Sequence, residues 1–210
     1  MTLLYFWFIF EIMSQNFQYN NADFISKELN WLKLIIYKRR KQLFSSEEPG
    51  FDLPEPQPAN VNNSIYCEFL SLNKFSRYER LLLILALSLH IEPGFLDILT
   101  PNDMAPLSYT HLFGQMSKGY KGIVPTGQTF LFLAAGKNKR LRFEVQSLLV
   151  KDHLFARQQI LGILPSLEGE PIYSGKIIMS EFYVEFFTLG IQSQEKYSIR
   201  NCLNNQTPIT

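Results

Sequence analysis

A run of seven apolar residues, Leu81 to Leu87, constrains the fold of this chain more than any other segment. The run follows Ser76-Arg77-Tyr78-Glu79, in which the serine and the glutamate have the spacing of a capping box. This motif begins helices because each of the two side chains accepts a hydrogen bond from the other residue's backbone amide. A helix that is apolar nearly all round is buried nearly all round. We therefore predict that the helix beginning here is the central helix of the core.

The rest of the chain predicts a mainly α fold with one small β-hairpin (α+β). The segment around Leu29, Leu32 and Ile35 has helical apolar spacing, and Asp23 sits where an N-cap belongs. Ser180 is placed to cap the last helix, which Gly190 closes. The predicted helices are Ala22–Phe44, Ser64–Leu72, Pro93–Leu99, Thr126–Ala135, Asn138–Val150 and Ser180–Leu189, and the predicted strands are Arg157–Leu164 and Pro171–Met179.

Composition divides the chain into five parts, the first of which is the apolar N-terminus, residues 1–12. Residues 45–63 hold four prolines and four acidic residues with little apolar periodicity, which is typical of a linker. They separate an N-terminal helix (13–44) from a winged-helix-like domain (64–190), and the polar residues 191–210 form a tail. Inside the domain, residues 100–125 are predicted to form a long loop, which makes them a candidate functional surface.

The N-terminus is intensely apolar from Leu3 to Phe10, but eight residues are too few to span a bilayer. The segment lacks the basic region and the cleavage site of a signal peptide. We interpret residues 1–12 as upstream sequence read as coding or as an apolar terminal strand, and we favour both over a membrane anchor. Without a secretory signal, we expect the two cysteines to be reduced and the protein to be cytoplasmic.

The stretch from Gly122 to Thr129 (GIVPTGQT) differs at one position from a phosphate-binding loop, because Gln128 replaces the lysine that reaches the phosphates. No run of Val or Ile leads into Gly122, as a buried strand would, and no later segment shows four apolar residues ending in Asp or Asp-Glu for a magnesium site. We therefore predict that the match is coincidental and that Thr126 caps a helix. Its capping box with Thr129 is imperfect because it lacks the carboxylate.

The residue types that carry chemistry do not indicate an enzyme. The three histidines form neither an H-x-x-E-H nor an H-E-x-x-H grouping, and Cys67 and Cys202 match no metal spacing. We expect no catalytic residue, no cofactor and no metal. A net charge of +1 does not by itself indicate nucleic-acid binding either.

Three helices followed by a hairpin is the element order of a winged-helix domain, here with an extra N-terminal helix. In such domains the helix before the hairpin contacts DNA. Here that helix is Asn138–Val150, and its N-terminal end carries Lys137, Lys139, Arg140 and Arg142. DNA binding is therefore one hypothesis. We favour protein docking, because specific DNA-binding proteins show a wider basic footprint.

A collinear set of phrases extends from about Asn30 to Gly190. It comprises Asn30-Trp31-Leu32, Asn63-Ser64-Ile65-Tyr66, Glu79-Arg80-Leu81, His90-Ile91-x-Pro93, Phe95-Leu96-Asp97, Phe113-Gly114, Gly122-x-x-Pro125-Thr126-Gly127-Gln128-Thr129-x-Leu131-Phe132-x-Leu-Ala135-Gly136 and Asp152-His153-x-Phe155. In these phrases the chain resembles the N-terminal region of a group of bacterial AAA-type ATPases, some encoded beside phage-tail-like contractile injection systems. It departs from them where the family often has a second glycine after Gly114 and a glutamate at position 128.

The resemblance implies a winged-helix-bearing adaptor whose ATPase module lies further downstream. The chain ends about where a linker into that module would run, so the resemblance implies an adaptor without its motor or, alternatively, a truncated remnant of an ATP-binding AAA protein. We expect a non-catalytic interaction module with a protein partner, for example an AAA-type ATPase, and no membrane contact. The candidate contact residues are Lys137, Lys139, Arg140, Arg142, Gly122, Pro125, Thr126 and Gly127.

Overall fold

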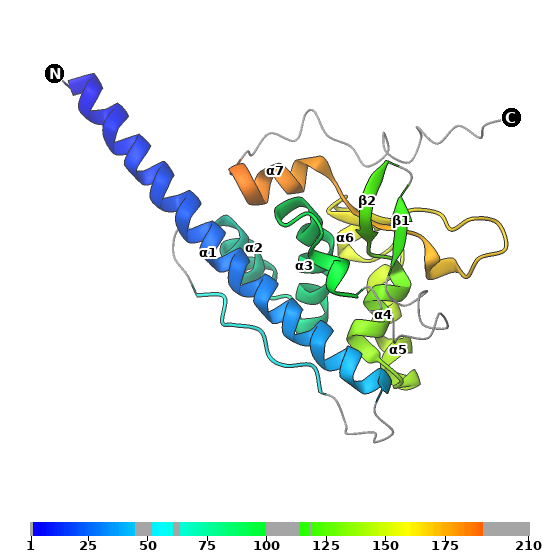
Figure 1. Ribbon diagram of the computed structural model, residues 1–210. Helices are drawn as coiled ribbons and strands as arrows, with labels where there is room; N and C mark the ends of the chain where they lie inside the picture. Colours follow the sequence, from blue (N-terminus) through cyan, green and yellow to red (C-terminus); the bar gives the residue numbers. More distant parts are fainter. Residues whose placement is uncertain (1, 45–51, 61–63, 100–113, 118, 191–210) are drawn as a thin grey trace, which may run out of the picture.

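The computed structural model describes residues 2–44, 52–60, 64–99, 114–117 and 119–190. Helices dominate, and two small antiparallel sheets complete the fold, so the predicted mainly helical α+β class is confirmed. Helix α1 lies along one side of the body, and its N-terminal part projects beyond the other helices (Figure 1). The helices are α1 (Thr2–Phe44), α2 (Ile65–Asn73), α3 (Arg77–Ile91), α4 (Gly127–Ala135), α5 (Lys139–Gln146), α6 (Leu154–Arg157) and α7 (Glu181–Leu189), and the 3-10 turns are η1 (Phe95–Leu99), η3 (Ser147–Leu149) and η4 (Ile172–Ser174).

Helix α3 is the central helix of the core, as predicted. Every residue from Arg80 to Ser88 is buried, and α1, α4 and η1 pack against the helix. Each fully buried leucine in this run contributes about 1.5–3 kcal/mol through removal of its side chain from water. The capping box is also confirmed, because the Ser76 amide donates to the Glu79 carboxylate at 2.8 Å and the Glu79 amide donates to Ser76 Oγ at 3.3 Å.

Helix α1 is one continuous helix, which corrects two predictions. Residues 2–12 are helical and do not form a strand. Asp23 lies within the helix, where it pairs with Lys27 at 2.7 Å instead of capping an N-terminus. The reason is that residues 2–44 contain neither glycine nor proline, so nothing in the sequence stops the helix between its apolar start and its amphipathic end.

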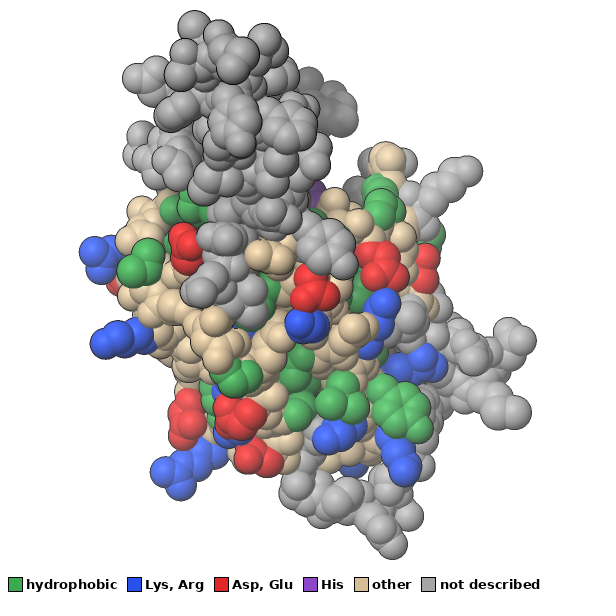
Figure 2. All heavy atoms as spheres, turned by 90° about the vertical axis from the view of Figure 1, so that its left-hand side faces the viewer, with side chains coloured by type: hydrophobic (Ala, Val, Ile, Leu, Met, Phe, Trp, Pro, Cys, Tyr) green, Lys and Arg blue, Asp and Glu red, His purple; other side chains and the backbone are tan. Residues whose placement is uncertain are grey.

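The outward face of α1 is mixed in character. Leu34 is 43% exposed and Tyr37 68% exposed. Figure 2 looks onto this side of the molecule and shows acidic, basic and apolar side chains together on it. Among the described residues, no helix has the length and apolar character needed to pass through a bilayer.

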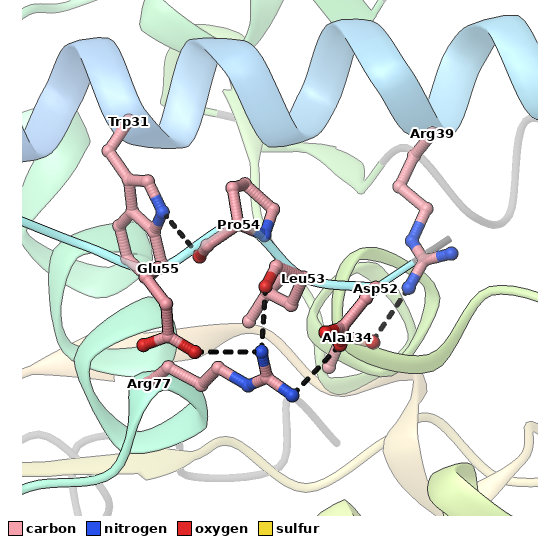
Figure 3. Close-up of polar contacts among 8 residues, drawn as sticks. All are labelled: Trp31, Arg39, Asp52, Leu53, Pro54, Glu55, Arg77 and Ala134. Atoms are coloured by element: carbon pink, nitrogen blue, oxygen red, sulfur yellow. Dashed lines mark hydrogen bonds and ion pairs between the residues drawn. The ribbon is translucent and has the colours of Figure 1, made fainter. Parts of the chain in front are cut away.

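Residues 52–60, which belong to the predicted linker, pack as an extended segment between α1 and α3. Leu53 is buried, and Trp31 of α1 donates its indole N–H to the Pro54 carbonyl oxygen at 2.9 Å. On the other side, Arg77 of α3 donates to the Leu53 carbonyl oxygen at 2.8 Å and pairs with two carboxylates of the segment (Figure 3). The described part of the predicted linker is therefore fixed to the body on both sides.

A β-hairpin that was not predicted lies inside the long segment expected to be a loop. Strands β1 (Gln115–Ser117) and β2 (Tyr120–Val124) pair antiparallel. Gly114 has a φ of 113°, and a Cβ on it would lie 2.5 Å from the Val124 carbonyl oxygen, so the start of this hairpin requires glycine. The loop prediction is wrong for these residues, because such short strands leave too little alternation to detect. Residues 100–113 lie outside the described part.

The one hairpin that was predicted is present with shorter strands, and it is the second hairpin along the chain. β3 (Leu161–Ile163) pairs antiparallel with β4 (Ile177–Met179). On the other side of β4, the Ile177 amide donates to the Pro125 carbonyl oxygen at 2.8 Å, and Thr126 forms an isolated bridge with Lys176. The segment that leads into α4 therefore lies beside the hairpin that follows α5.

The predicted strand ends are wrong because short helices replace them. Arg157 belongs to α6, which begins where the His153 side chain accepts a hydrogen bond from the Phe155 amide at 3.3 Å. The 3-10 turn η4 occupies the start of the second predicted strand. Helix α5 likewise ends at Gln146 and continues as η3.

Helix α7 has the predicted bounds. Its aromatic side chains form one cluster with those of α1 and α2. The buried Phe187 ring lies 5.1 Å from the rings of Tyr66 and Phe69. The Asn21 side chain of α1 donates to the Phe187 carbonyl oxygen and accepts from the Tyr66 amide at 3.0 Å. The start of the body, its last helix and α1 are therefore held together at one point.

Candidate functional site

Helix α4 begins at the near-match to a phosphate-binding loop, and the protein's own groups occupy this helix end. Thr126 Oγ1 accepts from the Thr129 amide at 3.2 Å, and Thr129 Oγ1 accepts from the Thr126 amide at 3.0 Å. The Gly127 amide donates to the Gly175 carbonyl oxygen at 3.1 Å. The predicted helix start is confirmed, and a threonine hydroxyl completes the capping box in place of the missing carboxylate. Three of the amides that would surround a phosphate, those of Thr126, Gly127 and Thr129, are thus used internally.

The four predicted contact residues at this junction are buried, which corrects their assignment to a contact surface. Gly122, Pro125, Thr126 and Gly127 all lie beneath the surface of the described structure. A Cβ on Gly127 would lie only 2.9 Å from the Tyr173 carbonyl oxygen, because η4 packs directly on this helix end. The junction is therefore a packing contact between α4 and the second hairpin.

Gln128, at the position of the missing lysine, joins the two helices that precede the second hairpin. Its side-chain oxygen accepts a hydrogen bond from Arg142 of α5. Burial lowers the pKa of Arg142, and the nearby Tyr173 phenol acts in the opposite direction. Arg142 is thus half-buried and engaged within the protein, so it contributes little to the basic cluster predicted from sequence.

The other three basic residues of the predicted contact set reach the surface. Lys137 and Lys139 are exposed at the turn between α4 and α5. The Arg140 side chain is 92% exposed and lies 3.6 Å from the carboxylate of Glu144, one turn further along α5. An acidic neighbour on the same face reduces the positive potential that a phosphate backbone would meet.

The outer face of α5 also carries an exposed aromatic residue that sequence reasoning missed. Phe143 is 69% exposed, whereas Val145 is buried and Leu141 is half-buried against the body. In a helix, a residue two positions from each of two inward-facing neighbours points outward. The spacing of Phe143 from Leu141 and Val145 was present in the sequence, but the prediction considered only the basic residues around it.

An apolar groove with a volume of about 790 Å³ opens beside the end of α5. One wall is η3 and α6, with Leu148, Leu149 and Phe155 among its residues. The other wall is β3 and the connection after it, which includes Ile163. The two walls are close in the sequence, but their relative position depends on how β3 and η4 fold back beside η3 and α6, so the groove could not be predicted from the sequence.

The buried charges of α1 attach this helix to the body. Glu28 pairs with Arg80 of α3 at 2.5 Å; burial raises the pKa of Glu28, and the hydrogen bond and charge of Arg80 act in the opposite direction. Arg39 donates to the carbonyl oxygens of Leu133 at 2.8 Å and Ala134 at 2.7 Å, so it caps the C-terminal end of α4 (Figure 3). Burial lowers the pKa of Arg39 to about 10.

The described residues contain no group of three or more His, Cys, Asp and Glu side chains that could hold a metal ion. Comparison with known proteins yields no matching family model, no matching curated protein and no matching solved structure.

We expect the chain to bind no ATP, because the amides of Gly127 and Thr129 at the start of α4 are already hydrogen-bonded and Gln128 stands where the phosphate-binding lysine would be. Isothermal titration calorimetry with Mg-ATP should give no binding heat. Thr129→Ala should lower the free energy of unfolding by about 1 kcal/mol, through loss of half of the capping box, and change nothing else. ATP hydrolysis that disappears in Thr129→Ala would contradict this expectation and support the remnant of an ATP-binding protein.

Proposed function

We propose that this chain is a non-catalytic interaction module that docks a protein partner through the outer face of helix α5. The observation that carries the proposal is Phe143, which stands 69% exposed in the middle of that face. Burying an aromatic side chain at an interface contributes about 1.5–3 kcal/mol. Large anchors of this kind, surrounded by polar residues, dominate the energy of many protein interfaces.

The order of the elements, which is similar to that of a winged-helix domain, supports the proposal. Helices α3, α4 and α5 precede the β3–β4 hairpin, with only the short η3 and the four-residue α6 between α5 and β3, and the segment before α4 lies along the far side of β4. In winged-helix domains the helix before the hairpin is the contact helix. Here the last full helix before the hairpin, α5, carries the exposed Phe143 and Lys139, and Lys137 lies in the turn that leads into it.

The resemblance to the N-terminal regions of bacterial AAA-type ATPases supports an adaptor role in the cytoplasm. We propose such an ATPase as the first candidate partner. The chain would then supply the recognition surface while the partner supplies nucleotide chemistry.

A photo-crosslinking amino acid placed at Phe143 tests the proposal in the cells that produce the protein. We expect one defined protein adduct after irradiation, because the side chain at this position enters the interface. The matched control is Leu72 of α2, which is 82% exposed and lies outside α5. An adduct of equal intensity from both positions would count against a specific surface on α5. With the partner identified, Phe143→Ala should weaken binding about ten- to one-hundredfold.

DNA binding is the second candidate function, favoured by the exposed Lys137 and Lys139 at the N-terminal end of α5. A nucleic-acid adduct from position 143 would favour it over protein docking. Binding of duplex DNA that weakens steeply with salt, and that disappears when Lys139 and Arg140 are replaced by alanine, would establish it. The acidic Glu144 beside Arg140 is the reason that we place this function second.

A further inference from the structure

The groove lies beside the end of α5, the helix whose outer face carries Phe143. The 3-10 turn η3 follows α5 directly, and its Leu148 and Leu149 line the groove. Ile172, which also lines the groove, is 74% exposed. A volume of about 790 Å³ falls within the range of about 300–1,000 Å³ in which proteins bind compact ligands. Several apolar side chains of a peptide would fit into such a space.

The charges around this surface differ in sign from one end to the other. At one end, Lys137 and Lys139 are exposed, and the described part of the protein provides no ion pair for either. At the other end, Glu168 and Glu170 are exposed in the connection that continues from the groove wall. Between them, the charges of Arg140 and Glu144 offset each other. The eight residues of α5 span about 12 Å, so the basic end and the groove lie within reach of one short segment.

We infer that the groove receives an apolar segment of the protein partner, whose adjacent carboxylates face the lysines at the start of α5. This inference rests on the proposed function, because it takes the partner to be a protein. Apolar side chains of the segment fill the groove, and carboxylates on its other side meet Lys137 and Lys139. A nucleic acid would fit poorly, because its phosphates would face an apolar groove and Glu144.

Peptide selection tests the chemistry of the occupant without knowledge of the natural partner. A phage-displayed library of random 16-residue peptides is selected on the immobilised full-length chain, and the affinities of the enriched peptides are measured by fluorescence anisotropy. We expect enrichment of peptides with two or more acidic residues next to an apolar stretch. Enrichment of basic peptides, or no enrichment at all, would overturn the inference.

A substitution in the groove wall shows where the peptides bind. Gly162 lines the groove, and an added Cβ there would meet no atom within 4 Å, so Gly162→Phe is expected to fill the groove without moving the backbone. The enriched peptides should bind this variant at least about one-hundredfold more weakly. The matched control is Gly119→Phe in the turn of the first hairpin, where an added Cβ also meets nothing within 4 Å. Equal binding to both variants would show that the groove is not the site.

A charge exchange tests the lysine end. Replacement of Lys137 and Lys139 by glutamate should weaken the acidic peptides about tenfold, and peptides with lysine in place of the acidic residues should bind this variant better than the wild type. If the lysine-bearing peptides do not bind the variant better than the wild type, the partner's carboxylates do not face Lys137 and Lys139.

The groove and docking through α5 can be tested separately. A protein adduct from position 143 that persists in Gly162→Phe would leave docking through α5 in place and remove the groove from it.

Discussion

Replacement of Arg80 by methionine is expected to lower the free energy of unfolding by about 3–5 kcal/mol near pH 7. Arg80 is the partner of the fully buried carboxylate of Glu28, with which it forms two hydrogen bonds of 2.5 and 3.3 Å. Methionine preserves most of the side-chain volume but leaves a negative charge in the core without a partner. Denaturant unfolding followed by circular dichroism measures the loss, and a loss below about 1 kcal/mol would contradict this account.

The loss should depend on pH in a direction that identifies its cause. Burial places the folded-state pKa of Glu28 above 4.5, the value expected for an unfolded chain, and removal of Arg80 raises it further. Between the unfolded-state pKa of 4.5 and the folded-state pKa, the folded state holds the proton of Glu28 more tightly than the unfolded state does. Stability therefore increases as the pH falls through this window, and it increases more in the variant, whose folded-state pKa is higher. The deficit of Arg80→Met should therefore be largest near neutral pH and shrink toward pH 4.5. A deficit that does not change with pH would point to lost packing instead.

Two control variants separate charge from volume. Arg77→Met removes a neighbouring arginine of α3 whose carboxylate partners are largely exposed, so we expect a cost of only about 1 kcal/mol. The double variant with Glu28→Leu and Arg80→Met removes both charges and should recover most of the lost stability.

Substitution of Gly175 by alanine is expected to destabilise the protein by about 3 kcal/mol or more. An added Cβ would lie 1.8 Å from the carbonyl oxygen of Leu164, on the strand segment that faces it. The φ of Gly175 is −61°, which alanine adopts freely, so the cost comes from this collision and not from backbone strain. Because the Gly175 carbonyl also accepts from the Gly127 amide, the start of α4 should be disturbed together with the hairpin.

The matched control for this substitution lies in the same hairpin. Gly162→Ala adds the same methyl group where no atom lies within 4 Å, so stability should change by less than about 1 kcal/mol. Thermal unfolding of the two variants side by side measures the contrast. Similar melting temperatures for the two would mean that the segments around Leu164 and Gly175 can move apart without cost.

The helices could be predicted from the sequence because local signals mark them. Ser76 with Glu79, Thr126 with Gly136, and Ser180 with Gly190 give helix ends that the structure reproduces. The strands had weaker signals. The three-residue strand β3 is paired with residues 14 to 18 positions away, and its surroundings are decided by tertiary contacts that no local pattern records.

The candidate site was only partly accessible from the sequence. Of the basic residues predicted as contacts, Lys137, Lys139 and Arg140 are exposed, whereas Arg142 is half-buried, and their contact role stays a prediction. The buried position of Gly127 depends on η4, which packs on it from a distant part of the chain. Phe143 was visible in the sequence as an outward-facing aromatic residue of the helix. The groove beside it exists only once the second hairpin has folded.

The attachment of α1 to the last helix has a consequence for folding during synthesis. The side chain of Asn21 bonds to the backbone of Phe187, which the ribosome adds 166 residues later. At about 5–20 residues per second, the two groups are synthesised on the order of ten to thirty seconds apart. During that interval the apolar face of α1 around Leu32 and Ile35, buried in the folded protein, has no finished surface to cover it. The nascent helix is therefore a natural substrate for ribosome-associated chaperones.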